Sequence, residues 1–313
     1  MDDPTRALAA QTLRRWALDE QLKTRVMSSP ELAAIATTVA RRYTAGETIA
    51  DALASARRSQ ASGHLASIEY TGESVRDAAL ADAEAQVFVD LVTAMRADGV
   101  VATVSGDLSH VGLLQSPEQA LANASMIAAA LEPLGTAFMI SAEGSDRTDA
   151  VLDVYEALSA RHANVGITLQ ARLHRSPADL DRLLALPGRI RLVKGAFLED
   201  ESVALRRDDP ALADRYAELA RRIGEAGHPV AVATHDEVLL RRVLDAPSLP
   251  DDTEVEMLLG LGTDLLARLR AEGRTTREYS IFGREWWLYV LNRVAEHPER
   301  VVAAVADLGA SAG

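Results

Sequence analysis

Short apolar runs recur along the chain from residue 65 onward, and each is followed by a longer amphipathic stretch whose apolar residues have helical spacing. A run of this kind predicts a strand, and the stretch behind it predicts a helix. The repeated alternation of strand and helix predicts a (β/α)8 TIM barrel. The eight expected strands are residues 65–72, 99–106, 135–143, 164–171, 188–196, 229–236, 253–260 and 277–283.

A doubly wound open sheet also alternates strands with helices. Its dinucleotide-binding form carries a G-x-G-x-x-G motif directly after the first strand. No such motif follows residues 65–72. The closed barrel is therefore the fold that we predict.

The first 60 residues predict helices and no strand. Ser29 is a suitable N-cap for one helix, because Pro30 then occupies its first turn. Another helix covers "GETIADALASARRSQASG" and ends at Gly63. This segment lacks the apolar content for a core of its own. We therefore expect an N-terminal helical arm (1–63) that packs on a barrel domain (64–313).

The composition narrows the function classes. Hydrophobic residues make up 48% of the 313 positions and charged residues 25%, which is typical of a folded chain with a large core. The net charge of −13 argues against nucleic acid or an anionic membrane as the main partner. The chain has no cysteine, which excludes disulfides, thiolate zinc sites and cysteine nucleophiles. Its seven histidines show no metal-ligand pair at helical spacing, so we predict no metal.

Membrane and export signals are not visible in this sequence. No apolar run reaches the roughly 18 residues of a transmembrane helix, and the N-terminal "MDDPTRALAAQ" is acidic and polar, unlike a signal peptide. We therefore expect a cytoplasmic protein without a transmembrane segment.

Polar residues gather where the expected strands end, which is the active-site face of a (β/α)8 barrel. Arg189, Arg191 and Lys194 lie in or directly after one such strand, and a strand that only filled a core would have little use for three cations. They indicate an anionic or electron-rich ligand. The polar residues at the strand ends are Glu69, Asp107, Glu143, Gln170, Arg191, Lys194, Thr234, His235, Glu256 and Tyr279.

Six segments, taken together and in order, resemble the proline dehydrogenase family over about residues 65 to 300. The resemblance implies an FAD-dependent (β/α)8 barrel that oxidises the C–N bond of proline to a pyrroline imine and passes two electrons to FAD. The matching segments are "IEYTGESV" (68–75), "LSHVGL" (108–113), "RLVKGAF" (191–197), "ATHD" (233–236), "EVEMLLG" (254–260) and "YSIFGREWWLYVLNRVAEHPE" (279–299).

The resemblance implies a flavin contact for the strand that holds Arg191. This guanidinium would reach the N5 edge of the ring, where a fixed positive charge stabilises the reduced form. The backbone of Val193, Lys194 and Gly195 would line the cofactor, and Gly195 has no Cβ to obstruct a close approach. A barrel-end salt bridge is the alternative for Arg191, and pairing with a surface acid is the alternative for Lys194.

Further cofactor contacts come from four other segments by the same resemblance. Gln170 would donate to a ring carbonyl of the flavin, and Ala142 would lie beside the cofactor. Thr234 and His235 would hold its phosphate or ribose part. Glu296 would bind the adenosine end, although it would be equally at home as a helix surface charge.

The substrate half of the site departs from the family pattern. The family binds the carboxylate of proline with a lysine after strand two and an arginine pair on the last helix, and an aspartate on strand three positions the lysine. Here Asp107 stands at the lysine, Ser141 at the aspartate and Asn292 at the first arginine, so only Arg293 is retained. The summed charge of these four positions falls from +2 to 0, which predicts weaker binding of free proline.

Three functions fit this pattern. The preferred one is oxidation of a C–N bond in a cyclic amine or proline derivative by hydride transfer to flavin N5. In it Asp107 binds the ammonium or takes its proton, and Tyr279 and Leu258 shape the pocket. The second is an ordinary L-proline dehydrogenase whose cations come from other positions, such as Arg172 or Arg175. The third is a catalytically silent flavin-binding or scaffolding barrel. The substrate, the electron acceptor (a quinone or another group) and the oligomeric state stay open.

Overall fold

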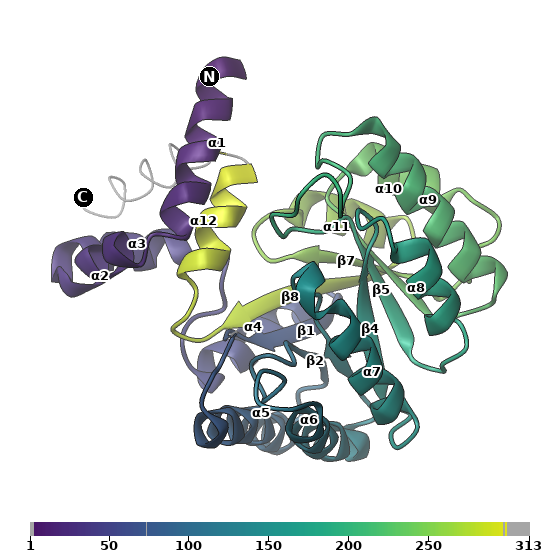
Figure 1. The fold of residues 1–313 in the computed structure, drawn as a ribbon, viewed down its shortest axis with the longest axis horizontal. Coiled ribbons are helices and arrows are strands. Elements are labelled where there is room, and N and C mark those ends of the chain that lie inside the picture. The colour runs from purple at the N-terminus through teal and green to yellow at the C-terminus, as the bar shows by residue number, and fades with distance from the viewer. Residues whose placement is uncertain (1–2, 73, 297, 299–313) are drawn as a thin grey trace.

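The computed structural model describes residues 3–72, 74–296 and 298 and contains a closed barrel of parallel strands (Figure 1). The strands are paired in sequence order, and β8 closes the barrel on β1. The (β/α)8 prediction is confirmed: seven of the eight expected segments contain a strand, and β8 begins at Thr275, two residues before the expected start. The strands are β1 (Leu65–Tyr70), β2 (Ala102–Gly106), β3 (Phe138–Ile140), β4 (Val165–Gln170), β5 (Arg189–Val193), β6 (Val230–Ala233), β7 (Glu254–Leu258) and β8 (Thr275–Phe282).

A helix follows each of the first seven strands and covers the outside of the barrel (Figure 1). Several begin where the sequence offers a side-chain cap, as at Asp77, Asp209 and Asp236, whose carboxylates accept from backbone N–H groups in the first turn. These helices are α5 (Ala78–Asp98), α6 (Pro117–Leu131), α7 (Thr148–Ser159), α8 (Ser176–Leu183), α9 (Pro210–Glu225), α10 (Glu237–Leu244) and α11 (Thr263–Ala271).

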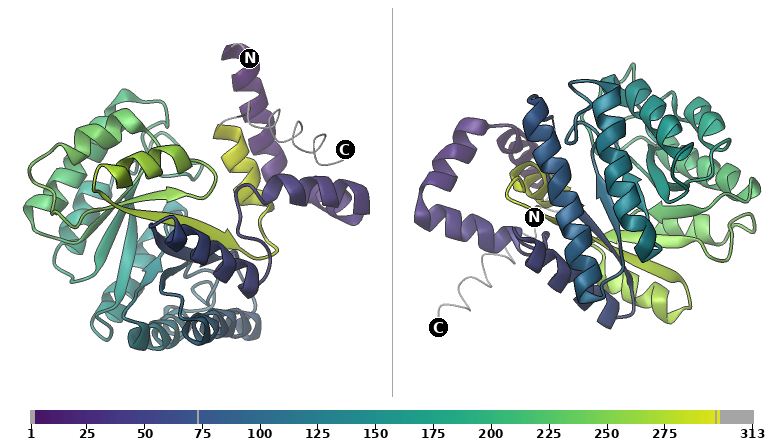
Figure 2. Two further views of the ribbon diagram at one scale, coloured as in Figure 1. Left: turned by 180° about the vertical axis from the view of Figure 1, so that it is seen from behind. Right: turned by 90° about the horizontal axis from the view of Figure 1, so that it is seen from below.

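The eighth helix of the outer ring comes from the N-terminal part of the chain. Helix α4 (Ile49–Ala61) packs on β1 and β8 and buries Ala52, Leu53 and Ala56 (Figure 2). At its C-terminal end the ideal Cβ of Gly63 would lie 2.1 Å from the guanidinium of Arg270 on α11, so this turn of chain lies directly against α11. Because α4 takes this place, the helix that follows β8 is free to lie elsewhere.

That last helix, α12 (Trp287–Glu296), packs against α1 (Asp3–Ala17), as Figure 1 shows. The indole N–H of Trp287 donates to the carbonyl of Trp16 at 3.0 Å. A separate apolar cluster joins α12 and the arm to the C-terminal ends of β7 and β8. It contains Ala40, Tyr43, Leu261, Tyr279, Ile281, Trp286, Trp287, Val290 and Val294.

The remaining arm helices are α2 (Glu20–Ser28) and α3 (Pro30–Ala40). Ser29 caps α3 as predicted, with its hydroxyl 3.5 Å from the N–H of Leu32. The sequence did not predict α2 as a separate helix. Asp19 sets its boundary, because the Asp19 carboxylate accepts from the N–H of Leu22 at 2.9 Å and so begins a new helix. None of the helices among the described residues has the length and apolarity needed to cross a membrane.

The wall role of α4 predicts a large effect of Leu53→Ala. Leu53 is 3% exposed, so its truncation should lower the free energy of unfolding by about 2–5 kcal/mol. Leu32→Ala on α3, where the side chain is 49% exposed, should change it by less than about 0.5 kcal/mol. Urea denaturation followed by circular dichroism measures both. Equal effects of the two substitutions would contradict the placement of α4 in the wall.

Candidate active site

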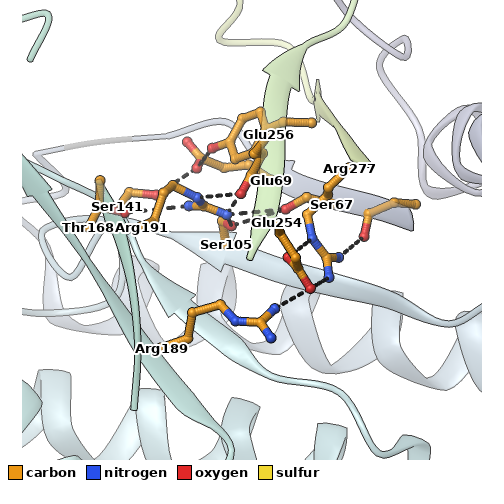
Figure 3. A network of polar contacts seen from close by, with 12 residues as sticks. Ser67, Glu69, Ser105, Ser141, Thr168, Arg189, Arg191, Glu254, Glu256 and Arg277 are labelled. Carbon is orange, nitrogen blue, oxygen red and sulfur yellow. Dashed lines mark hydrogen bonds and ion pairs between the residues drawn. The ribbon is translucent and has the colours of Figure 1, made fainter. Parts of the chain in front are cut away.

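Arg191 lies inside the barrel, where its guanidinium contacts side chains on four other strands (Figure 3). Its Nε donates to Glu256 Oε2 at 2.9 Å, and its Nη2 lies 2.9 Å from Glu256 Oε1, so the two side chains form a close buried ion pair with one hydrogen bond. Nη2 also donates to the hydroxyls of Ser105 at 3.1 Å and Ser67 at 3.3 Å. Only 5% of Arg191 is exposed. The side chain is thus held in one orientation by charge and by hydrogen bonds.

A second buried carboxylate, Glu69 on β1, collects hydroxyl groups beside this pair. Ser141 donates to Glu69 Oε2 at 2.6 Å, and the Tyr279 phenol donates to the same oxygen. The Arg191 guanidinium lies over the Tyr279 ring, with its Cζ 5.0 Å from the ring centroid. Burial raises the pKa of Glu69 above its usual 4.5, whereas the Ser141 hydroxyl and the charge of Arg191 oppose the rise.

The residues at the end of β4 fit a flat ligand with a polar edge. Gln170 donates from Nε2 to the carbonyl of Glu143 at 2.9 Å, and its buried Oε1 has no donor among the described residues. Gly195 has a φ of +108°, and a Cβ there would lie 2.8 Å from Arg172 and 3.1 Å from Gln170 Oε1. A buried amide oxygen without a partner is costly. The ring N–H of a flavin would satisfy it.

The loop after β6 is organised by its own polar side chains. Thr234 Oγ1 accepts from the N–H of Asp236, and Asp236 forms an ion pair of 2.7 Å with Lys194. His235 Nε2 accepts from the backbone N–H of Leu258 at 3.1 Å, which places the proton of a neutral ring on Nδ1. The alternative role of Lys194, pairing with a surface acid, is therefore realised. The contacts proposed for Thr234 and His235 stay predictions.

The other predicted residues lie at the same end of the barrel. Asp107 is the first residue after β2 and Ala142 is the second residue after β3, and both are half-buried. Val193, which ends β5, is two residues after Arg191 and therefore shares its face of the strand. Leu258 ends β7 and packs with the apolar cluster that contains Tyr279. Proximity to one face does not by itself assign these residues a ligand.

Helix α12 supplies the residues Asn292, Arg293 and Glu296. Arg293 Nη1 lies 3.1 Å from Glu296 Oε1, and its Cζ lies 5.6 Å from the ring centroid of Tyr289. Burial raises the pKa of Tyr289. The positive charge of Arg293 lowers this pKa, and the negative charge of Glu69 raises it further. Tyr289, which belongs to α12, is therefore within electrostatic range of both Arg293 and Glu69. Asn292 is half-buried on the same helix.

A group of arginines that the sequence did not predict stands close to Arg293. The Nε atoms of Arg14, Arg207 and Arg293 are buried without an acceptor among the described residues. Burial, followed by the positive charges of Arg14 and Arg172, lowers the pKa of Arg207 to about 10. Like charges must lie near one another to have this effect. Arg207 comes from the long loop between β5 and α9, which contains no periodic pattern that could have marked it.

Arg172 and Arg175, named above as alternative cations, are occupied within the protein. Arg172 donates from Nε and Nη2 to the carbonyl of Leu205, at 2.9 and 2.8 Å, and so holds the loop that carries Arg207. Arg175 pairs with Asp149 and Asp179. The two residues support the loops around the site.

These features define a (β/α)8 barrel enzyme with a buried charged site at the carboxyl ends of its strands. Its fold is similar to that of proline utilization A (PutA) from Bdellovibrio bacteriovorus, with a TM-score of 0.78 and 17% identity. The likeness covers 93% of this chain and 36% of that longer chain. At this identity the likeness shows the fold alone.

Sequence comparison gives the family. The chain is 32% identical to proline dehydrogenase from Deinococcus radiodurans over 279 residues, which cover 86% of this chain and 90% of the relative. It is 28% identical to proline dehydrogenase 1 from Bacillus subtilis over 263 residues, or 83% and 87% of the two chains. The family model for proline dehydrogenase matches residues 52–293. The chain belongs to the proline dehydrogenase family, which consists of FAD-dependent oxidoreductases.

The buried ion pair predicts a double-mutant result. Glu256→Met leaves the Arg191 charge without its carboxylate and should lower the free energy of unfolding by about 3–5 kcal/mol. Arg191→Met combined with Glu256→Met should recover much of this loss, because no buried charge is left alone. Glu218→Met, which breaks an exposed pair with Arg221, should cost less than about 1 kcal/mol. Additive losses in the double variant would contradict the pairing.

The raised pKa of Glu69 predicts a pH-dependent effect of Glu69→Gln. The folded chain holds the Glu69 proton more tightly than the unfolded chain, so the contribution of Glu69 to stability is greatest below its usual pKa of 4.5 and declines as the pH rises through the raised pKa. Glutamine does not titrate. The free energy of unfolding of the variant relative to the native chain should therefore rise as the pH increases from the usual pKa of 4.5 toward the raised pKa of Glu69. Urea titrations across this range test it, and a pH-independent difference would contradict the assignment.

Proposed function

We propose that the chain is a dehydrogenase that oxidises the C–N bond of a cyclic amine or proline derivative to an imine. The observation that carries this proposal is the convergence of Ser141 and Tyr279 on Glu69, beside the buried Arg191, in a barrel of the proline dehydrogenase family. FAD, when bound, supplies the acceptor for the hydride. The free Oε1 of Gln170 and the close backbone at Gly195 are the features of this chain that suit the cofactor.

In this proposal the protein contributes charge and orientation. Arg191 is held rigidly by Glu256, so its positive charge needs no reorganisation when negative charge develops beside it. Glu69 accepts two hydroxyl hydrogen bonds, and its raised pKa suits a base that takes the proton of a substrate ammonium through Tyr279 or Ser141. Asp107 adds a second carboxylate at the same end of the barrel. This acidic half favours an amine over a substrate recognised by its carboxylate alone.

A second candidate is oxidation of L-proline itself, and the arginines near α12 favour it. Three buried Nε–H groups, on Arg14, Arg207 and Arg293, have no acceptor among the described residues. A substrate carboxylate would satisfy them with charge-assisted hydrogen bonds. In this case Arg14 and Arg207 replace the cations that the family places at positions 107 and 292.

Anaerobic mixing of the purified flavoprotein with L-proline, L-prolinamide and other cyclic amines separates the candidates. The first predicts that prolinamide bleaches the flavin absorbance at least as well as proline. The second predicts a preference for proline, and a roughly tenfold loss of apparent affinity for proline in Arg207→Gln. Arg206→Gln is the matched control, because its side chain is 60% exposed and pairs with Asp208.

The spectrum of the protein tests the proposal as a whole. A chain that carries no flavin and cannot be reconstituted with FAD would favour the third possibility, a silent scaffolding barrel. A flavin that no amine of the panel reduces would exclude both oxidative candidates. We further propose a quinone or another two-electron acceptor and a cytoplasmic location, which fractionation and acceptor assays can check.

A further inference from the structure

The amino-terminal mouth of the barrel leads to a cavity of about 620 Å³, at the end opposite the candidate active site. Its rim is formed by residues that directly precede strands, among them Ala137, Asn164, Gly188 and Pro229. Barrels of this fold usually fill their interior with layers of branched apolar side chains. Here small side chains such as Ala231 leave the space open. The volume lies within the range of ligand sites in proteins.

Three charged residues form a triad in this cavity (Figure 3). Glu254 accepts from Arg277 Nε at 2.7 Å and from Arg277 Nη2 at 2.9 Å, and Arg189 Nη1 donates to it as well. Burial acts to raise the pKa of Glu254, but Arg277 and Arg189 outweigh burial and lower it. The triad therefore stays fully ionised at neutral pH, with one positive charge in excess.

The positive charge in excess is that of Arg189, which lines the cavity. Glu254 is the one acceptor that the Arg189 guanidinium meets among the described residues, which leaves its Nε and Nη2 donors unused. Arg161 and His162 lie on the rim and form no side-chain hydrogen bond or ion pair within the described chain. The lining as a whole carries four arginines against three glutamates, in a chain whose net charge is −13.

We propose that this cavity is a second ligand site, which binds a small organic anion with a carboxylate or phosphate group on the free edge of Arg189. A guanidinium with two unused N–H donors matches both groups, because either offers two oxygens at the spacing of the fork. Arg161 and His162 would close over the anion from the rim. The anion would compensate the unbalanced charge of the triad, which is otherwise left to water.

The floor of the cavity connects the proposed site to the centre of the barrel. Arg191 and Glu256 both line the cavity, and the same Arg191 contacts Tyr279 and the hydroxyl of Ser105. A bound anion would therefore share a wall with the ion pair of the candidate active site. The proposed site is nevertheless separate from the function proposed above, since it lies at the other mouth and needs no flavin.

Thermal unfolding of the full-length protein, as purified, tests the proposal. One series contains inorganic phosphate and a second contains citrate or acetate, and sodium chloride keeps the ionic strength constant in both. The midpoint should rise in a saturable manner with one class of anion, as expected for a ligand that binds the folded state. Arg189→Gln should weaken the apparent affinity about tenfold or more. Glu254 keeps its pair with Arg277 in this variant, so the triad is not left unbalanced.

Two matched controls separate the cavity from other cationic surfaces. Arg182→Gln changes an arginine of similar side-chain exposure, 35% against 32% for Arg189, which is also ion-paired. The apparent affinity of Arg182→Gln for the anion should be within about twofold of that of the native chain. Arg207→Gln removes a cation at the opposite mouth and should also leave it unchanged. Ala231→Ile narrows the cavity without altering any charge and should weaken binding as Arg189→Gln does.

Several outcomes would overturn the proposal. One is a native chain that shows no saturable stabilisation by either class up to about 20 mM. Another is equal stabilisation of the native chain and Arg189→Gln, which would mean that the anions act on the general surface. A loss in Arg207→Gln with retention in Arg189→Gln would assign the anion to the active-site mouth instead.

Discussion

The ion pair of Arg191 and Glu256 is the interaction around which the interior of the barrel is arranged. It places a guanidinium within reach of β1, β2, β4 and β7, and the hydroxyls of Ser67, Ser105 and Thr168 are needed to satisfy it. A buried pair of this kind contributes little net stability compared with an apolar replacement. Its consequence is orientation, because each partner would be strongly unfavourable if it moved away from the other.

The positions of α4 and α12 determine which residues surround the C-terminal end of β8. Since α4 covers β1 and β8, α12 does not occupy the wall and packs with α1 instead. Trp287 joins the two helices through the carbonyl of Trp16. This arrangement brings Arg14 of the arm into the electrostatic environment of Arg207 and Arg293. The N-terminal helices are therefore part of the site's surroundings as well as an attachment to the barrel.

The fold could be predicted from the sequence because its evidence is local. Apolar runs, amphipathic stretches and caps such as Ser29 each lie within a few residues, and the eight strands followed from them. An ion pair was one of the two roles expected for Arg191, and the structure contains one with Glu256. The partner of Arg191 could not be assigned, because Glu256 lies on β7 and meets it only through the closure of the barrel. Glu69 was visible as a polar strand end, but its contacts with Ser141 and Tyr279 depend on the same closure.

The site residues in loops could not be predicted from the sequence for a different reason. Arg207 lies in a loop without periodicity, and its position is fixed by Arg172 through the carbonyl of Leu205. By the resemblance to the family, Asp107 and Asn292 stand where relatives carry cations. Arg14 and Arg207 lie in elements that the family motifs do not include, and their buried Nε–H groups have no acceptor among the described residues. Motifs alone therefore cannot give the charge at this end of the barrel, because they count only the positions that they contain.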